Sequence, residues 1–128
     1  MERNNSHLAG EYFVAAELYR RSFSVAMTIG NAKAIDILVQ KDGKQTAVQV
    51  KAMQNKSSNF PIGNGVEQGV VYVFVNLNCN EDGFLPPDYY ICTAEEVEQI
   101  AKKYPSQSVV YLPALREGGF QDKWGKLE

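Results

Sequence analysis

Cysteine, histidine and long apolar runs are scarce in this sequence, and each scarcity excludes a class of protein. Two cysteines (Cys79 and Cys92) and one histidine (His7) are too few for a zinc site with four Cys or His ligands. Unpaired thiols in a reducing cytoplasm are favoured over a single disulfide. No segment approaches the roughly 20 consecutive apolar residues that span a bilayer. Residues 1–7 are polar and lack the apolar core of a secretory signal, so we expect a cytoplasmic protein without a membrane partner.

Length and charge describe an ordinary globular chain. Its 128 residues suit one domain over 1–128, and an apolar fraction of 45% can supply a core. The net charge of −2 does not indicate a nucleic-acid binder. Residues 1–60 nevertheless carry eight Lys/Arg against five Asp/Glu, whereas residues 61–128 carry five against ten. The first half is thus mildly basic, which permits a DNA partner without requiring one.

A β-hairpin is the clearest local feature. Two strand-like segments, residues 34–40 and 45–51, flank the turn sequence Lys41-Asp42-Gly43-Lys44. An Asp-Gly pair between β-branched runs is a strong hairpin signal, because glycine accepts the positive φ that a primed turn needs. With Asp42-Gly43 as the turn, Asp36 is expected opposite Gln49, and Lys51 on the same face. A carboxylate, an amide and an ammonium group would then converge at one end of the hairpin.

A helix before the hairpin would add another carboxylate. The pattern predicts a helix from about Ser6 to Arg21, with Asn5 or Ser6 as the N-cap. Helical spacing groups five residues into an apolar stripe: Leu8, Tyr12, Ala15, Leu18 and Tyr19. Glu11 falls near the middle of this stripe, where a carboxylate is unfavourable unless something there requires negative charge. Glu17 precedes Arg20 and Arg21 by three and four residues and is expected to be an ion-paired surface residue.

The rest of the chain alternates between strands, loops and one more helix. Strands are expected over residues 23–28, 70–77, 89–92 and 109–112, and the second of these is apolar enough to be covered on both faces. Residues 55–69 are rich in Gly, Asn and Ser and predict a long irregular loop. Thr93 and Glu96 form a capping box that opens a helix running to about Tyr104. This mixture predicts an α/β domain with one central sheet.

Together, Gly10-Glu11 on a helix, Asp36 on a strand and Gln49-Val50-Lys51 on its partner strand resemble the PD-(D/E)XK nuclease superfamily. The likeness covers roughly residues 1–55 and is nearest to the resolvase and homing-endonuclease branch. It implies a restriction-endonuclease-like fold: a central mixed sheet, flanked by helices, with an antiparallel hairpin carrying the active site. The implied function is a Mg²⁺-dependent DNA endonuclease, of a site-specific homing or restriction type.

Three positions depart from the family pattern. Ser22 stands where a glycine follows the helix, and Ile35 replaces the proline before the aspartate. Gln49 replaces the acidic residue of the E-x-K motif. A Gln carbonyl can ligate Mg²⁺ as a neutral oxygen, but the site loses one negative charge and should hold the ion more weakly. Glu11, directed inward, would supply the missing charge.

The resemblance gives each site residue a role in phosphodiester hydrolysis. Asp36, Gln49 and the Val50 carbonyl would hold Mg²⁺, for which Mn²⁺ can substitute, and Glu11 would hold a bound water or a second ion. Lys51 would orient or deprotonate the attacking water and offset charge in the transition state. Glu11, Asp36, Gln49 and Lys51 are therefore the expected catalytic residues.

The partner implied by the resemblance is double-stranded DNA. His7, Lys33 and Lys56 are expected to contact phosphate, and His7 is favoured as an exposed residue near the helix start over a metal ligand. One subunit carries one site and cuts one strand, so double-strand cleavage implies a homodimer or homotetramer.

Two alternatives to a nuclease remain open at this point. The first is a catalytically silent member of the fold that binds nucleic acid or a protein. The second is an unrelated small-molecule or interaction domain, in which Asp36 and Lys51 form a surface ion pair and Glu11 lies out of reach of Asp36. Weak or absent metal binding would favour the first alternative.

Overall fold

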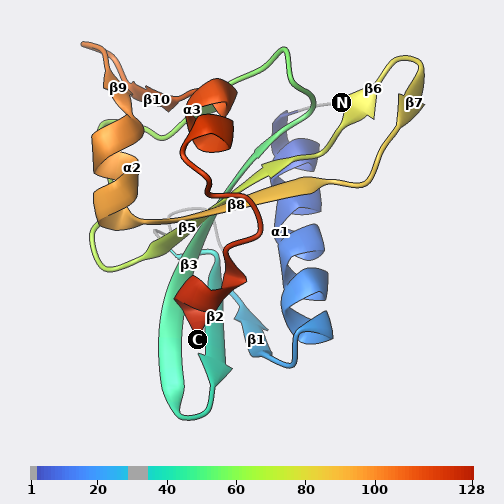
Figure 1. The fold of residues 1–128 in the computed structure, drawn as a ribbon, viewed down its shortest axis with the longest axis vertical. Helices are drawn as coiled ribbons and strands as arrows, with labels where there is room; N and C mark the ends of the chain where they lie inside the picture. Colours follow the sequence, from blue (N-terminus) through green and yellow to red (C-terminus); the bar gives the residue numbers. More distant parts are fainter. Residues whose placement is uncertain (1–2, 29–34) are drawn as a thin grey trace.

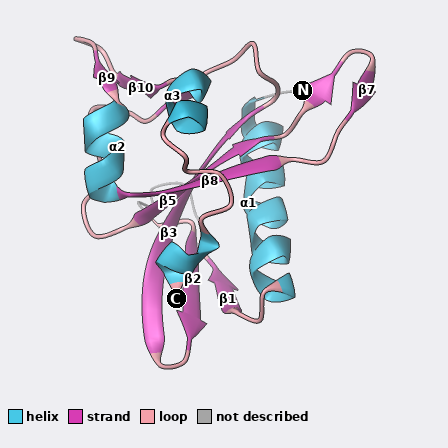
Figure 2. Cartoon of the chain, viewed as in Figure 1, coloured by secondary structure: helices cyan, strands magenta, loops and turns pink. Residues whose placement is uncertain are grey.

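A five-stranded mixed sheet with helices on both faces forms the centre of the molecule (Figures 1 and 2). The computed structural model describes residues 3–28 and 35–128. The sheet order is β1-β2-β3-β5-β8, with bounds Ser24–Met27, Ile37–Lys41, Lys44–Met53, Val71–Asn76 and Asp88–Thr93. Helix α1 (Arg3–Arg20) covers one face, and α2 (Ala94–Ile100) and α3 (Leu112–Glu117) cover the other. This arrangement confirms the predicted α/β fold with a central mixed sheet.

Smaller elements complete the chain. Strands β4 (Phe60–Pro61), β10 (Ser108–Val110) and β9 (Lys102–Lys103) form a second sheet, so the predicted loop 55–69 contains a short strand. Strands β6 (Cys79–Asn80) and β7 (Gly83–Phe84) form a hairpin, and a 3₁₀ helix, η1 (Trp124–Leu127), ends the chain. Among the described residues, no helix is long and apolar enough to cross a membrane. Cys79 and Cys92 are both free thiols, and burial raises the pKa of Cys92 to about 12.

The β2–β3 hairpin has the predicted turn and the predicted register. Asp42 and Gly43 both have positive φ, 52° and 81°, as a type I′ turn requires. The ladder runs from Lys41↔Lys44 to Ile37↔Val48. This is the register in which Asp36 would come opposite Gln49, as the turn predicts. The ladder stops one pair before Asp36 and Gln49, and β2 begins at Ile37, so residues 35 and 36 of the predicted strand 34–40 precede it. Residue 34 itself lies outside the described residues.

Strand β3 changes its partners along its length. Its first half pairs antiparallel with β2 as far as Val48, and its second half pairs in parallel with β5 from Val48 to Met53. Beyond Val48, within the described residues, the edge of β3 that faced β2 is joined by no further strand. This open edge leaves backbone groups of β3 available to side chains.

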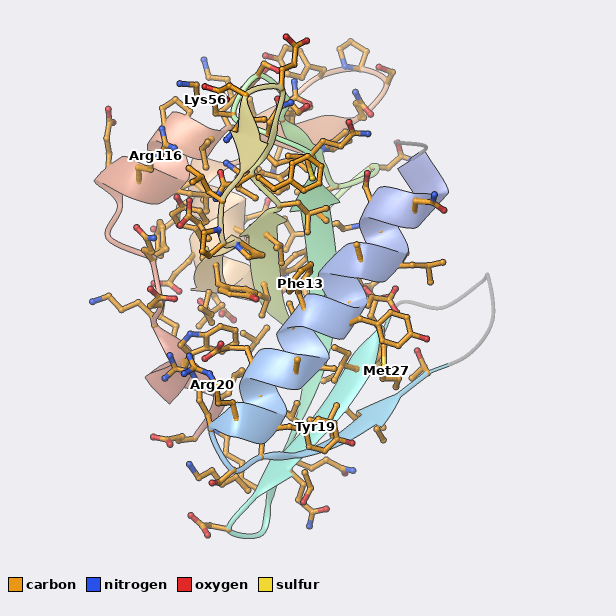
Figure 3. All side chains as sticks on the ribbon, turned by 90° about the vertical axis from the view of Figure 1, so that its right-hand side faces the viewer. Phe13, Tyr19, Arg20, Met27, Lys56 and Arg116 are labelled. Carbon is orange, nitrogen blue, oxygen red and sulfur yellow. The ribbon has the colours of Figure 1, made fainter. Side chains whose placement is uncertain are left out.

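The buried face of α1 differs from the predicted apolar stripe. Val14, Ala15 and Leu18 are buried, but Leu8, Tyr12 and Tyr19 are exposed by 42%, 63% and 60%. Figure 3 looks onto the outer side of α1, where Phe13 and Tyr19 are labelled. The helix also begins at Arg3, so Asn5 and Ser6 lie inside it rather than capping it. The stripe was wrong because Ser6, Gly10 and Glu11 occupy the first turns of the buried face.

The second helix is shorter than expected because a strand follows it directly. Thr93 and Glu96 form both hydrogen bonds of the predicted capping box. The helix ends at Ile100 instead of Tyr104, with Ala101 extended, and Lys102–Lys103 pairs with β10. The pairing of β9 with β10 thus ends the helix at Ile100, although local helix propensity would let it continue.

Helix α1 ends in a Schellman turn whose special position holds a serine. Phe23 N–H donates to Leu18 O and Ser22 N–H donates to Tyr19 O, each at 3.0 Å. Ser22 has φ of 70°, in the left-handed region that favours glycine. Leu18 and Phe23 are both buried in the core below the turn. The departure from glycine at this position therefore places strain at the end of the helix that carries Glu11.

Replacing Ser22 by glycine should relieve this strain. We expect Ser22→Gly to raise the free energy of unfolding by about 1 kcal/mol, because the left-handed conformation penalises any side chain. Ser24→Gly, two residues later in β1, is the matched control and should lower stability by about 0.5–1 kcal/mol. Urea denaturation of the two variants measures both effects, and a loss of stability in Ser22→Gly would contradict the assignment.

Candidate metal and active site

Two buried carboxylates meet where β2 begins and where β3, beyond Val48, is no longer paired with it. Glu11 on α1 and Asp36 before β2 are each only 2% exposed. Asp36 Oδ2 accepts the backbone N–H of Val50 at 2.8 Å, and Asp36 N–H donates to Val48 O at 3.0 Å. Asp36 is therefore held at the open edge of β3 by the backbone groups that β2 would otherwise pair with. Buried carboxylates require such partners, since an isolated buried charge is very unfavourable.

His7 completes the cluster from one helical turn before Glu11. Its Nε2 lies 2.5 Å from Glu11 Oε2 and 3.7 Å from Asp36 Oδ1. One potential ligand atom from each of His7, Glu11 and Asp36 lies within 4.8 Å of the others. The sequence analysis favoured His7 as an exposed residue near the helix start; it is instead half-buried against Glu11. The four-residue spacing of His7 and Glu11 on one helix was the signal that could have joined them.

A glycine lets α1 approach this edge of the sheet. A Cβ on Gly10 would lie 2.7 Å from the Cβ of Ala52 and 3.5 Å from Val50 Cγ1. Both neighbours belong to β3, the strand that carries Gln49 and Lys51. Gly10 is thus a point of close contact between the helix and strand on which the site is built, next to Glu11.

Gln49 and Lys51 approach the site from the other face of β3. Side chains alternate along a strand, and Val50 and Ala52 face α1, so Gln49 and Lys51 point to the opposite face. Burial lowers the pKa of Lys51, and the nearby Asp36 carboxylate partly opposes this shift. The Oε1 atom of Gln49 is buried and has no hydrogen-bond partner among the described residues.

These residues fit a hard divalent cation. Oxygen donors are what Mg²⁺ and Mn²⁺ take from proteins, and the cluster offers two carboxylates. The buried amide oxygen of Gln49, on the neighbouring strand β3, has no hydrogen-bond partner among the described residues. A residue in an extended strand directs its N–H and C=O to the same side. Because the Val50 N–H is bonded to Asp36, the Val50 carbonyl faces the same open edge. Of the predicted metal-ligating groups, Glu11 and Asp36 are thus brought together at this edge, and the Val50 carbonyl faces it.

A cleft extends from the site toward β4. It encloses about 840 Å³ and is lined by groups from α1, β3, β4 and two loops: Ser6, His7, Lys51, Ala52, Met53, Gln54, Ser58, Asn59, Phe60, Pro61 and Gln107. Its polar lining consists mainly of amide and hydroxyl side chains, which the sequence analysis did not identify. Lys56 is exposed in the loop before β4, at the end of the molecule where α1 begins (Figure 3). Lys33, the remaining predicted phosphate contact, lies outside the described residues.

The structure contradicts the alternative in which Asp36 and Lys51 form only a surface ion pair. If Asp36 and Lys51 formed a mere surface pair, Asp36 would be exposed and Glu11 would be out of reach. Asp36 is buried, and ligand atoms of Asp36 and Glu11 lie within 4.8 Å of each other. By contrast Glu17 binds the Arg20 and Arg21 side chains at 2.8 and 2.7 Å, as expected for a surface ion pair. The two helical glutamates therefore have different roles.

Two solved structures with a similar fold are those of nucleases. The chain is similar to a bacterial homing endonuclease, I-Ssp6803I, with a TM-score of 0.64 and 13% identity over 98% of this chain and 93% of that one. It is also similar to Hjc, a Holliday junction resolvase from the archaeal hyperthermophile Archaeoglobus fulgidus, with a TM-score of 0.54 and 10% identity over 86% and 92% of the two chains. No protein-family model and no curated protein sequence matches the chain.

The fold is therefore that of the PD-(D/E)XK nucleases, as the helix and hairpin motif predicted. At these identities the likeness establishes the fold, and the chemistry of this chain depends on its own residues. The two similar structures span nearly the whole chain, so the likeness extends beyond residues 1–55, where the motif lies.

Substituting Gly10 tests whether its close contact positions the site. We expect Gly10→Ala to lower the free energy of unfolding by about 1–3 kcal/mol, because the added methyl overlaps Ala52 in a packed interface. Gly125→Ala is the matched control: a Cβ there meets nothing within 4 Å, and a change within about 0.5 kcal/mol is expected. Urea denaturation measures both. Stabilisation of about 1 kcal/mol in Gly10→Ala, the gain expected from helix propensity alone, would contradict the close contact.

Proposed function

We propose that this protein is a divalent-metal-dependent endonuclease that hydrolyses phosphodiester bonds in double-stranded DNA. The observation that carries the proposal is the convergence of Glu11, Asp36 and Lys51 at the open edge of β3. Asp36, Glu11, the Gln49 amide oxygen and the Val50 carbonyl would hold Mg²⁺, with Mn²⁺ as a substitute. A bound ion of this kind supplies Lewis acidity toward a phosphate oxygen.

The chain's own groups perform the remaining tasks. Asp36 is fixed by Val50 N–H, so its second oxygen is directed to a ligand without a further conformational change. The partly buried Lys51 orients the attacking water and offsets negative charge that builds up as the phosphate becomes five-coordinate. Burial strengthens this interaction, because nearby protein dipoles and charges act at a lower effective dielectric than water.

DNA would lie along the cleft that leaves the site. The amide and hydroxyl groups lining it can donate to and accept from phosphates and base edges, and Lys56 stands nearby. The chain is acidic overall, so binding would depend on local contacts more than on net charge. Each chain carries one such site, so cutting both strands requires at least two copies, as in a homodimer or homotetramer.

The neutral Gln49 favours a second candidate function, DNA binding without cleavage. One negative charge fewer weakens metal binding, and a chain that holds DNA without cutting it would have the same fold and cleft. The specific feature that favours this alternative is Gln49 itself, in the position of the family's acidic residue. Metal binding and cleavage must therefore be measured separately.

Nicking of supercoiled plasmid tests the enzyme directly. We expect cleavage with Mg²⁺ or Mn²⁺, none with EDTA, and a loss of at least about a hundredfold in Lys51→Ala, because that variant lacks the group that orients water and offsets charge. Lys123→Ala is the control: Lys123 is exposed next to Trp124, whose ring lies under Arg21 at the far end of α1, and its activity should stay within about twofold. DNA binding without cleavage across several substrates would support the silent alternative, and cleavage that survives Lys51→Ala would overturn the site assignment.

Lys56 offers a test of where DNA lies. We expect Lys56→Ala to weaken DNA binding and to reduce the slope of log affinity against log salt by about 1, the value for one lost phosphate contact. Fluorescence anisotropy over a series of salt concentrations measures the slope, with Ca²⁺ in place of Mg²⁺ to suppress cutting. Lys123→Ala should leave the slope unchanged. Equal slopes for wild type and Lys56→Ala would place the DNA elsewhere.

A further inference from the structure

His7 occupies a position that a phosphate contact does not explain. Its imidazole is 39% exposed, but Nε2 is directed inward, 2.5 Å from Glu11 Oε2 and 3.7 Å from Asp36 Oδ1. A residue held for binding DNA would direct its polar atom outward into the cleft. His7 instead directs the atom most suited to metal ligation at the two carboxylates that would hold the ion.

We infer that His7 is a ligand of the bound divalent ion, through Nε2, and that it gives the site a preference for Co²⁺ and Mn²⁺ over Mg²⁺. This inference rests on the proposed metal-dependent function. Two ligands that each lie about 2.1 Å from an ion are about 3.0 Å apart when adjacent and about 4.2 Å apart when opposite. His7 Nε2 and Asp36 Oδ1, 3.7 Å apart, already lie within this range. Small side-chain adjustments that widen the 2.5 Å His7–Glu11 contact and draw in the third oxygen would place all three ligand atoms around one ion.

Helix geometry supports simultaneous ligation by His7 and Glu11. Residues four apart lie one above the other on a helix face, so both side chains reach the same point beside β3. The close approach of α1 to β3 at Gly10 brings that point to Asp36. The position of His7 relative to the site is thus fixed by the packing of the helix that carries it.

The chemistry of the donor set gives the expected selectivity. Mg²⁺ prefers all-oxygen coordination, whereas imidazole suits the later first-row metals, and the affinity of a given site for divalent ions rises from Mn²⁺ through Co²⁺ and Ni²⁺ to Cu²⁺. Gln49 removes one anionic oxygen from the usual set, and the nitrogen of His7 adds a stronger donor. Exchanging a carboxylate for an amide and gaining an imidazole should lower Mg²⁺ affinity more than Co²⁺ affinity.

The single histidine makes the test specific. With the purification tag removed, His7 is the only imidazole in the chain, so any imidazole signature from bound metal reports this residue. Isothermal titration with Co²⁺ and with Mg²⁺ gives the two affinities. Proton NMR of the Co²⁺ form detects the hyperfine-shifted, exchangeable Nδ1–H that remains when Nε2 binds the metal. Neither measurement depends on DNA cleavage.

We expect wild-type protein to bind Co²⁺ at least about tenfold more tightly than Mg²⁺. His7→Ala should lose about tenfold or more in Co²⁺ affinity and the shifted Nδ1–H resonance, while Mg²⁺ affinity changes less than about threefold. Leu8→Ala, at the exposed neighbouring position on α1, controls for effects on the helix and should retain both affinities. Circular dichroism verifies that each variant keeps its helix.

The outcomes separate this inference from the proposed function. If wild type binds both ions but His7→Ala leaves the Co²⁺ to Mg²⁺ ratio unchanged, the inference is overturned and the nuclease proposal stands. Binding of neither ion by wild type, with no difference from Asp36→Asn, would overturn both. An intact shifted resonance in His7→Ala would assign the signal to a group other than His7 and likewise overturn the inference.

Discussion

The burial of two carboxylates beside each other is the constraint on which the rest of this structure depends. Glu11 and Asp36 are almost fully removed from water, which is unfavourable for two anions unless nearby groups compensate. The compensation comes from three sources: the Val50 N–H, the His7 imidazole and the Lys51 side chain. His7 comes from α1, and Val50 and Lys51 come from β3, so the site exists only in the complete packing of α1 against the β2–β3 hairpin.

Two residues of this segment, Gly10 and Ser22, lower the stability of the fold. Gly10 is unfavourable in the middle of a helix, and Ser22 adopts a backbone conformation better suited to glycine. Gly10 contributes to the site directly, because a larger residue would separate Glu11 from Asp36. Ser22 strains the other end of the same helix. Local stability is thus lower in α1 than its length suggests, as is common where function and not stability determines the sequence.

Local features of the fold could be predicted from the sequence, whereas non-local ones could not. The Asp42–Gly43 turn fixed the hairpin register, and the Thr93–Glu96 capping box fixed a helix start, because both depend on residues within a few positions. The apolar stripe of α1 was wrong since helical periodicity assumes that apolar residues are buried, and here Ser6, Gly10 and Glu11 fill the inner face. The second helix ended early because β9 pairs with β10, which is held in turn by β4 from a distant part of the chain.

The candidate site could be predicted in part for the same reason, because some of its contacts are local in sequence. Asp36 and Lys51 belong to one hairpin, so their proximity follows from the turn. The inward position of Glu11 followed from its place on the helix. His7 was missed because it was interpreted as an exposed residue near the helix start, although its four-residue spacing from the inward Glu11 places both on one helix face. The open edge of β3 was missed because it depends on where β2 begins.

The position of the candidate site residues along the chain has a consequence for how this protein can diversify. Every side chain assigned to the chemistry lies between residues 7 and 51, on one helix, one hairpin and its approach. The loop around Lys56, strand β4 and the β6–β7 hairpin follow that segment in the chain and contribute no assigned ligand. Changes in those later elements would alter which surface a substrate meets while leaving the candidate metal site intact. Under the proposed function, target choice and reaction chemistry would therefore be encoded on separate stretches of one short chain.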